Sequence, residues 1–168
     1  MPTPKKQKQL KQRKINNMNP LNLFRNAPNP ETFKGIQKNP WMLSRIFQGD
    51  KELAKKYFSF NEWLKICKNP SSLEENEIIE VEDLLKSSIS SFDDAIKYHF
   101  YLPYDHRINW RNEFIDYAKS VKDLQFILNH IDKPNQREYE IYRKKIVSKM
   151  RQIAITKEEK KIAFSYKI

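Results

Sequence analysis

Apolar residues recur at helical spacing along most of the chain. The segment after Asn135 shows this most clearly, because its apolar positions follow one another at intervals of three or four residues. These positions are Tyr139, Tyr142, Ile146, Met150 and Ile153. The pattern predicts an amphipathic helix with one face toward a core. We therefore expect an all-α, compact multi-helix domain of about seven to nine short helices.

Four Asn-Pro pairs predict helix starts in the first half of the chain. They lie at 19–20, 29–30, 39–40 and 69–70. Asn caps the unpaired amides of a first turn, and Pro already has a helical φ. The first three pairs predict helices at about 20–27, 31–38 and 40–48. We expect Gly49 to end the last of these helices in a left-handed conformation.

A second group of helix starts has a Ser or Thr followed three residues later by an acid. This capping-box pattern occurs at Ser59, Ser72, Ser91, Ser120 and Thr156. Three of these segments resemble one another: SFNEWLKI (59–66), SFDDAIKY (91–98) and, more weakly, SVKDLQFI (120–127). Their intervals of about 30 residues are typical of paired-helix repeats. The alternative is that any Ser-capped helix with a buried aromatic residue gives the same pattern.

The last eight residues, KIAFSYKI (161–168), are the one segment with a possible strand pattern. Ile162, Phe164, Tyr166 and Ile168 alternate with polar or small residues. A helix end that turns into an extended tail would give the same alternation. The pattern leaves both interpretations open.

The composition supports helices and limits the classes of protein. The chain has 168 residues but only two glycines, which hairpin-rich sheet folds would need in larger number. A single cysteine, Cys67, excludes an internal disulfide and a multi-cysteine metal site. We expect a cytoplasmic, reducing location and no membrane-spanning segment, and mitochondrial targeting by the basic N-terminus is the less favoured alternative.

Positive charge is concentrated at the two ends of the chain. The formal net charge is +11, and residues 1–30 carry seven basic and no acidic side chains. We expect residues 1–18 to form a basic extended arm and 19–168 a single helical domain. The arm residues expected to bind phosphates are Lys5, Lys6, Lys8, Lys11, Arg13 and Lys14.

A second basic surface is expected on the helix that begins near Asn135. Arg137, Lys144 and Arg151 are seven residues apart and fall on the side opposite the apolar stripe, with Lys145 and Lys149 beside them. Such a row of cations suits a phosphate backbone. The alternative is the solvated face of an ordinary packed helix.

The middle of the chain is acidic. Residues 74–83, EENEIIEVED, hold six acids in ten positions. We expect this segment to bind a basic protein partner, or else the chain's own basic arm.

Aromatic and titratable residues are dense at 98–110, YHFYLPYDHRINW. Tyr101, Tyr104 and Trp110 lie near Arg107 and Arg111, and rings interleaved with guanidinium groups favour stacking of unpaired bases. Core packing of these rings is the simpler alternative.

The same segment is the only candidate for chemistry. His99, Asp105 and His106 are close in sequence, but Pro103 breaks the helix between the two histidines. We therefore expect His99 at the edge of a core and Asp105 as a helix cap. We expect no catalytic residue, no metal and no cofactor.

Together these features favour a non-enzymatic nucleic-acid-binding accessory protein. Binding would use sequence-independent phosphate contacts to RNA or DNA, as in a ribonucleoprotein subunit or a replication or packaging accessory. A helical protein-interaction adaptor is the alternative.

Overall fold

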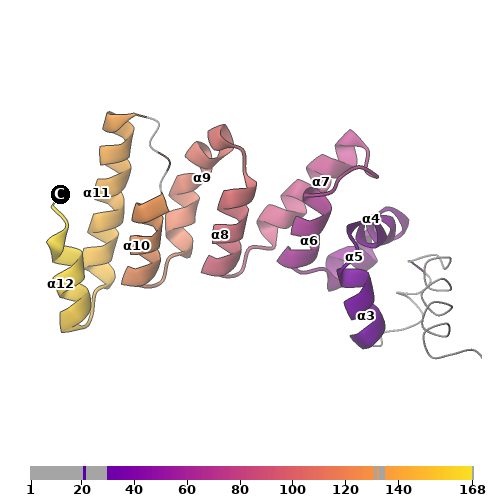
Figure 1. Cartoon of the computed structure of the whole chain (residues 1–168), viewed down its shortest axis with the longest axis horizontal. Helices are drawn as coiled ribbons and strands as arrows, with labels where there is room; N and C mark the ends of the chain where they lie inside the picture. Colours follow the sequence, from indigo (N-terminus) through magenta and orange to yellow (C-terminus); the bar gives the residue numbers. More distant parts are fainter. Residues whose placement is uncertain (1–20, 22–29, 131, 133–134, 168) are drawn as a thin grey trace, which may run out of the picture. The chain divides into compact units, whose positions relative to one another are not determined.

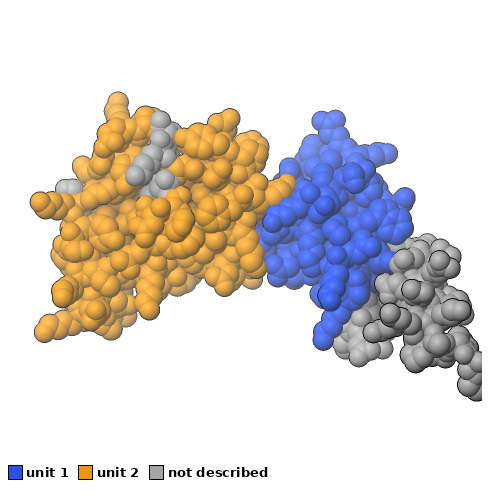
Figure 2. Space-filling view, viewed as in Figure 1, with its two compact units in different colours: residues 1–88 blue, residues 89–168 orange. Residues whose placement is uncertain are grey.

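The computed structural model describes residues 21, 30–130, 132 and 135–167, and the described part of the chain consists of helices and connecting turns without a strand. Ten helices are described, so the all-α prediction is confirmed and the count slightly exceeds the expected range (Figure 1). The chain divides into two compact units, residues 1–88 and 89–168 (Figure 2). The expected arm lies outside the described residues, and the expectation of one domain over 19–168 stays a prediction.

Unit 1 contains five of the helices. They are α3 (Pro30–Gln37), α4 (Pro40–Gly49), α5 (Lys51–Tyr57), α6 (Phe60–Cys67) and α7 (Glu75–Ser87). Its core is apolar and fully buried at Leu43, Ile46, Phe47, Ile66 and Leu85. The Trp63 ring meets Phe47 edge-on, with centroids 5.9 Å apart, and so joins α4 to α6.

Unit 2 contains the other five helices. They are α8 (Phe92–Tyr101), α9 (Tyr104–Tyr117), α10 (Val121–His130), α11 (Gln136–Ile153) and α12 (Lys157–Ser165). Phe92 stacks on Phe114 with centroids 5.6 Å apart and meets Phe126 edge-on at 6.1 Å, which joins α8 to α9 and α10. Ile146 and Met150 of α11 are fully buried in the same unit.

The three similar segments occupy equivalent places in three helix pairs. They begin α6, α8 and α10, and each of these helices packs against the next one, α7, α9 or α11 (Figure 1). The buried positions also agree: Trp63, Ala95 and Leu124 share one register position, and Ile66, Tyr98 and Ile127 share the position one turn later. The position after that holds Cys67, His99 and Leu128, so a histidine takes a place that is otherwise apolar.

Several predicted caps are present. Asn39 Oδ1 accepts from the Trp41 amide at 3.1 Å, directly before Pro40. Ser120 and Asp123 form a reciprocal capping box, with N–H to oxygen distances of 2.9 and 3.1 Å. Thr156 and Glu159 do the same at 2.9 and 3.1 Å. Ser91 caps the Asp94 amide at 3.1 Å.

Two predicted helix starts are wrong. Asn69 does not begin a helix, because its side-chain amide donates to the Lys65 carbonyl at 3.1 Å and thus serves the end of α6. Ser72 is not a cap, because Glu74 is the N-cap of α7 and forms the box with Glu77. The capping-box spacing pairs Ser72 with Glu75, whereas in the structure the box is formed by Glu74 and Glu77, two residues later.

Three further local predictions need correction. Gly49 is the last residue of α4 and has no positive φ, because Asp50, extended at φ −160°, both ends α4 and caps α5. Asp105 lies in the first turn of α9 and does not cap it, since Pro103 is at the cap position. The C-terminal segment is helical through Ser165, which excludes a strand over that part of 161–168.

Candidate functional site

Helices α11 and α12 expose a group of basic side chains that we call the C-terminal basic face. Its members are Arg137, Lys144, Lys145, Lys157, Lys160 and Lys161, all exposed. The buried side of α11 carries Tyr142, Ile146, Val147 and Met150, which leaves Arg137 and Lys144 on the solvent side. The α12 lysines are three, four and seven residues from Phe164, a spacing that brings them to one side of the helix.

Most acids of these two helices are already engaged. Glu138 pairs with Arg111 at 3.0 Å, Glu140 with Arg143 at 3.4 Å, and Glu159 caps α12. The pKa of Glu138 is lowered mainly by its hydrogen bond from Arg111. Within the described chain, no ion pair neutralises the cations of the face, and Lys145 bonds the neutral Asn112 amide oxygen at 3.1 Å. The exposed Glu158 is the one acid that offsets this positive charge on α12.

Two predicted phosphate contacts point into the fold. Lys149 donates to the Ile115 carbonyl at 2.6 Å and lies 3.9 Å from Asp116, so it packs against α9. Arg151 donates to the Tyr166 carbonyl at 2.8 Å and is partly buried beside α12. Arg137, Lys144 and Lys145 are therefore the predicted residues of α11 that remain exposed.

The predicted stacking residues do not share one surface. Trp110 is 3% exposed and meets the Tyr98 ring edge-on with centroids 4.8 Å apart, so it belongs to the core. Tyr101 is partly buried against Tyr98. Tyr104, 44% exposed, is the one member of the set that faces solvent broadly.

His99 lies in a buried polar cluster. It is 3% exposed and stacks on Phe114, with centroids 4.9 Å apart. Its Nε2 lies 3.9 Å from Asp132 Oδ2, and Arg107 Nη1 lies 3.4 Å from Asp132 Oδ1. The partner acid is therefore Asp132, 33 residues away in sequence, and not Asp105, which is exposed on α9 together with His106.

Burial dominates the electrostatics of this cluster. It lowers the pKa of His99; Asp132 acts in the opposite direction, and Arg107 and His130 add smaller lowering effects. Neither ring nitrogen of His99 has a hydrogen-bond partner among the described residues. Burial also raises the pKa of Tyr142, whose hydroxyl donates to the Arg111 carbonyl.

A small cavity adjoins the cluster. Its volume is about 10 Å³, and His99, Arg107, Arg111, His130, Asp132 and Tyr142 are among its lining residues. One water molecule needs about this volume. In the described parts of the chain, no three His, Cys, Asp or Glu side chains gather closely enough to hold a metal ion. The cavity therefore has room for about one water molecule beside the cluster.

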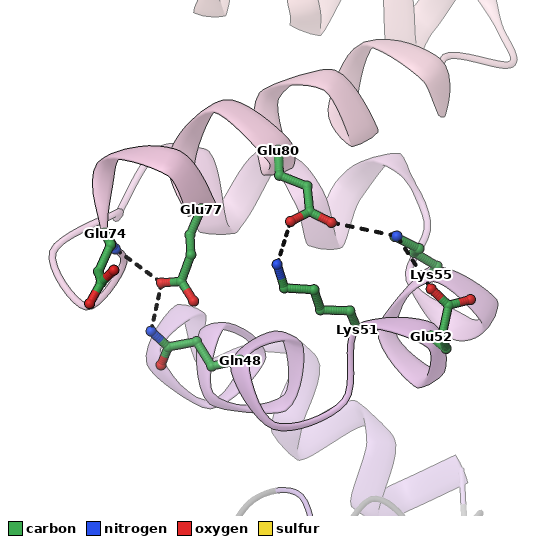
Figure 3. A network of polar contacts seen from close by, with 7 residues as sticks. All are labelled: Gln48, Lys51, Glu52, Lys55, Glu74, Glu77 and Glu80. Atoms are coloured by element: carbon green, nitrogen blue, oxygen red, sulfur yellow. Dashed lines mark hydrogen bonds and ion pairs between the residues drawn. The ribbon is translucent and has the colours of Figure 1, made fainter.

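The acidic segment 74–83 forms most of α7, and part of its charge is used within unit 1. Glu80 accepts from Lys51 at 2.5 Å and lies 3.5 Å from Lys55, both on α5 (Figure 3). Glu77 accepts from Gln48 at 2.9 Å and from the Glu74 amide at 3.0 Å. These contacts lower the pKa of both carboxyl groups, through Lys51 for Glu80 and chiefly through the Glu74 amide for Glu77.

The other side of α7 is exposed and carries further carboxylates. Ile79 is 56% exposed, and Glu75, Glu82 and Asp83 lie three or four residues from it. An apolar side chain surrounded by carboxylates would suit a basic partner with an apolar anchor.

Three cations of the basic face, Lys157, Lys160 and Lys161, were not predicted as binding residues. They precede Phe164 by seven, four and three residues, and this helical spacing is a signal in the sequence for one common face. The alternation of apolar residues at 162–168 obscured it. Asp132 carried no local signal, because its partner His99 is distant in sequence.

Comparisons with protein-family models, curated proteins and solved structures gave no significant match for this chain. No described helix is long and apolar enough to cross a bilayer.

Proposed function

We propose that the chain is a non-enzymatic nucleic-acid-binding accessory protein. The observation that carries this proposal is the C-terminal basic face, whose cations stay exposed while most neighbouring acids are paired or capping. Exposed, unneutralised cations on adjacent helices gain free energy from phosphates through release of condensed counterions. Binding of this kind is independent of base sequence and suits RNA or DNA.

The basic arm would add to the same interaction. Lys5, Lys6, Lys8, Lys11, Arg13 and Lys14 supply six further cations with no acid among residues 1–30. These cations would add phosphate contacts of the same sequence-independent kind to those of the C-terminal basic face. We place the protein in the cytoplasm, as part of the same proposal.

The test is a salt titration of binding with a charge-neutralised full-length chain. Lys144→Gln, Lys157→Gln, Lys160→Gln and Lys161→Gln together should reduce the slope of log K against log salt for duplex DNA by about 4. A matched control changes four exposed lysines elsewhere: Lys34→Gln, Lys38→Gln, Lys68→Gln and Lys122→Gln. Equal losses in both variants would show that net charge alone drives binding and would contradict a site on the face.

The exposed acidic side of α7 favours a second function, the binding of a basic protein partner. Ile79 with Glu75, Glu82 and Asp83 supplies an apolar point surrounded by negative charge. A helical adaptor that uses this surface without nucleic acid is the competing proposal. If nucleic-acid binding depends neither on the salt concentration nor on residues 1–18, the result would favour the adaptor proposal.

A further inference from the structure

Phe164 is a large aromatic side chain that remains exposed on α12. It is 62% exposed, although the preceding Ala163 is fully buried. The guanidinium carbon of Arg151 lies over its ring, 4.9 Å from the centroid. Arg151 is itself fixed by its hydrogen bond to the Tyr166 carbonyl. The ring is thus oriented by a cation and still open to solvent over most of its surface.

The surroundings of this ring are basic. Lys157, Lys160 and Lys161 precede Phe164 by seven, four and three residues, so all three lie on its side of α12. On α11, Lys144 precedes Arg151 by seven residues, or about two turns, and lies in nearly the same direction. The row of cations on α11 therefore leads toward the ring.

An exposed ring with cations around it matches the chemistry of unpaired nucleobases. Proteins that bind single strands combine cationic surfaces for the backbone with aromatic rings for the bases. In a duplex the bases stack on one another and their faces are covered. A solvent-exposed ring on a basic helix therefore distinguishes single strands from duplexes, which cations alone do poorly.

We propose that Phe164 stacks on an unpaired base of single-stranded nucleic acid while the C-terminal basic face holds the adjoining phosphates. This inference rests on the proposed nucleic-acid function and adds a preference for single strands. The stacking residue is then Phe164 at the end of α12. The set predicted from sequence was Tyr101, Tyr104 and Trp110, and Trp110 of that set is in the core.

The experiment compares Phe164 variants of the full chain by fluorescence anisotropy. The probes are a single-stranded oligonucleotide, a duplex of the same length and an abasic single strand that keeps the phosphates. Phe164→Leu keeps an apolar side chain beside Arg151 but cannot stack, and Phe164→Trp keeps an aromatic ring. Phe100→Leu is the matched control, because Phe100 is 53% exposed on α8 and outside the basic face.

Phe164→Leu should weaken single-strand binding about 5- to 150-fold, the range of one base–aromatic stack. Duplex and abasic binding should change less than about 2-fold, since phosphate contacts are unaltered. Phe164→Trp should bind the single strand as well as the wild type or better, and Phe100→Leu should match the wild type.

Other outcomes would overturn the inference in distinguishable ways. If Phe164→Leu leaves single-strand binding unchanged while the wild type still binds with a steep salt dependence, the stacking role fails and the proposed function stands. If the wild type binds none of the three probes at low salt, the proposed function itself fails. Equal losses on all probes with a lowered melting temperature would mark Phe164 as a purely structural contact.

Discussion

His99 Nε2 lies 3.9 Å from Asp132 Oδ2 within the interior of unit 2, at a repeat position that holds Cys67 and Leu128 in the other helix pairs. The stacked Phe114 ring and the absence of a hydrogen bond to the imidazole among the described residues favour its neutral form. Asp132, whose second oxygen lies near Arg107, raises the pKa of His99 by less than burial lowers it. This histidine should therefore make the stability of the protein depend on pH.

His99→Leu tests this dependence. Because the folded-state pKa of His99 is lowered from 6.5, the unfolded chain binds more protons below that pH. The wild type should lose stability as the pH falls from 6.5 toward the folded pKa, and this loss should be smaller in the variant. At neutral pH the variant should be as stable as the wild type or about 1–2 kcal/mol more stable, since a buried polar ring without a hydrogen-bond partner among the described residues is replaced by an apolar side chain.

Thermal melts across this pH range provide the measurement. His106→Gln is the control, because it removes an exposed imidazole of α9 and so separates the loss of any histidine from the loss of the buried one. Parallel profiles for the wild type and His99→Leu would show that other groups cause the pH dependence.

The ion pairs between α5 and α7 should contribute a modest, salt-sensitive part of the stability of unit 1. Glu80→Gln removes a carboxylate near both Lys51 and Lys55 and should cost about 0.5–1 kcal/mol at low salt, because the pairs are partly exposed. Glu52→Gln is the matched control. Glu52 is more exposed than Glu80, and among the described residues its one ion-pair partner is Lys55 of the same helix.

Denaturant unfolding at low and high salt measures the difference between these two variants. The cost of Glu80→Gln should shrink in high salt as the pairs are screened. The Glu80 pKa is lowered from 4.5, so its stabilisation is present above that pH and is lost as the pH falls through the folded-state pKa. A salt-independent cost would instead indicate lost packing.

Helix capping offers a test in which sequence and structure disagree. Ser120→Ala removes the hydroxyl that accepts from the Asp123 amide and should cost about 1 kcal/mol. Ser72→Ala should cost less than about 0.5 kcal/mol, because Glu74 caps α7 and the contact that Ser72 makes to Gln48 uses its backbone carbonyl, which the substitution keeps. Equal costs in urea unfolding would contradict this assignment of the caps.

Local chemistry explains why much of the fold could be predicted. Asn39, Ser120 and Thr156 satisfy amides within three residues of themselves, so their roles can be inferred from sequence alone. Asn69 could not be assigned this way, because its amide is equally able to serve the helix before it, and here it does.

The candidate site was less predictable because it depends on tertiary contacts. The helical period of 137–151 identifies Arg137 and Lys144 as exposed, but it cannot show that α12 covers Arg151 or that α9 takes up Lys149. The exposure of Phe164 likewise depends on which side of α12 meets the rest of unit 2. The sequence makes Trp110 a candidate for stacking, but its contact with the Tyr98 ring places it in the core.

The basic arm has two possible partners, a phosphate backbone or the acidic side of α7. If it binds phosphates, deletion of residues 1–18 removes six cations and should reduce the salt slope for duplex DNA by about 5, with weaker binding. If it binds Glu75, Glu82 and Asp83 instead, deletion should leave binding unchanged or tighten it. Calorimetry with a 1–18 peptide and the deleted chain separates these two partners. Salt-sensitive binding of the peptide would assign the arm to α7, provided that it is abolished by Glu75→Gln, Glu82→Gln and Asp83→Asn. The absence of binding heat, together with the reduced salt slope, would assign the arm to nucleic acid.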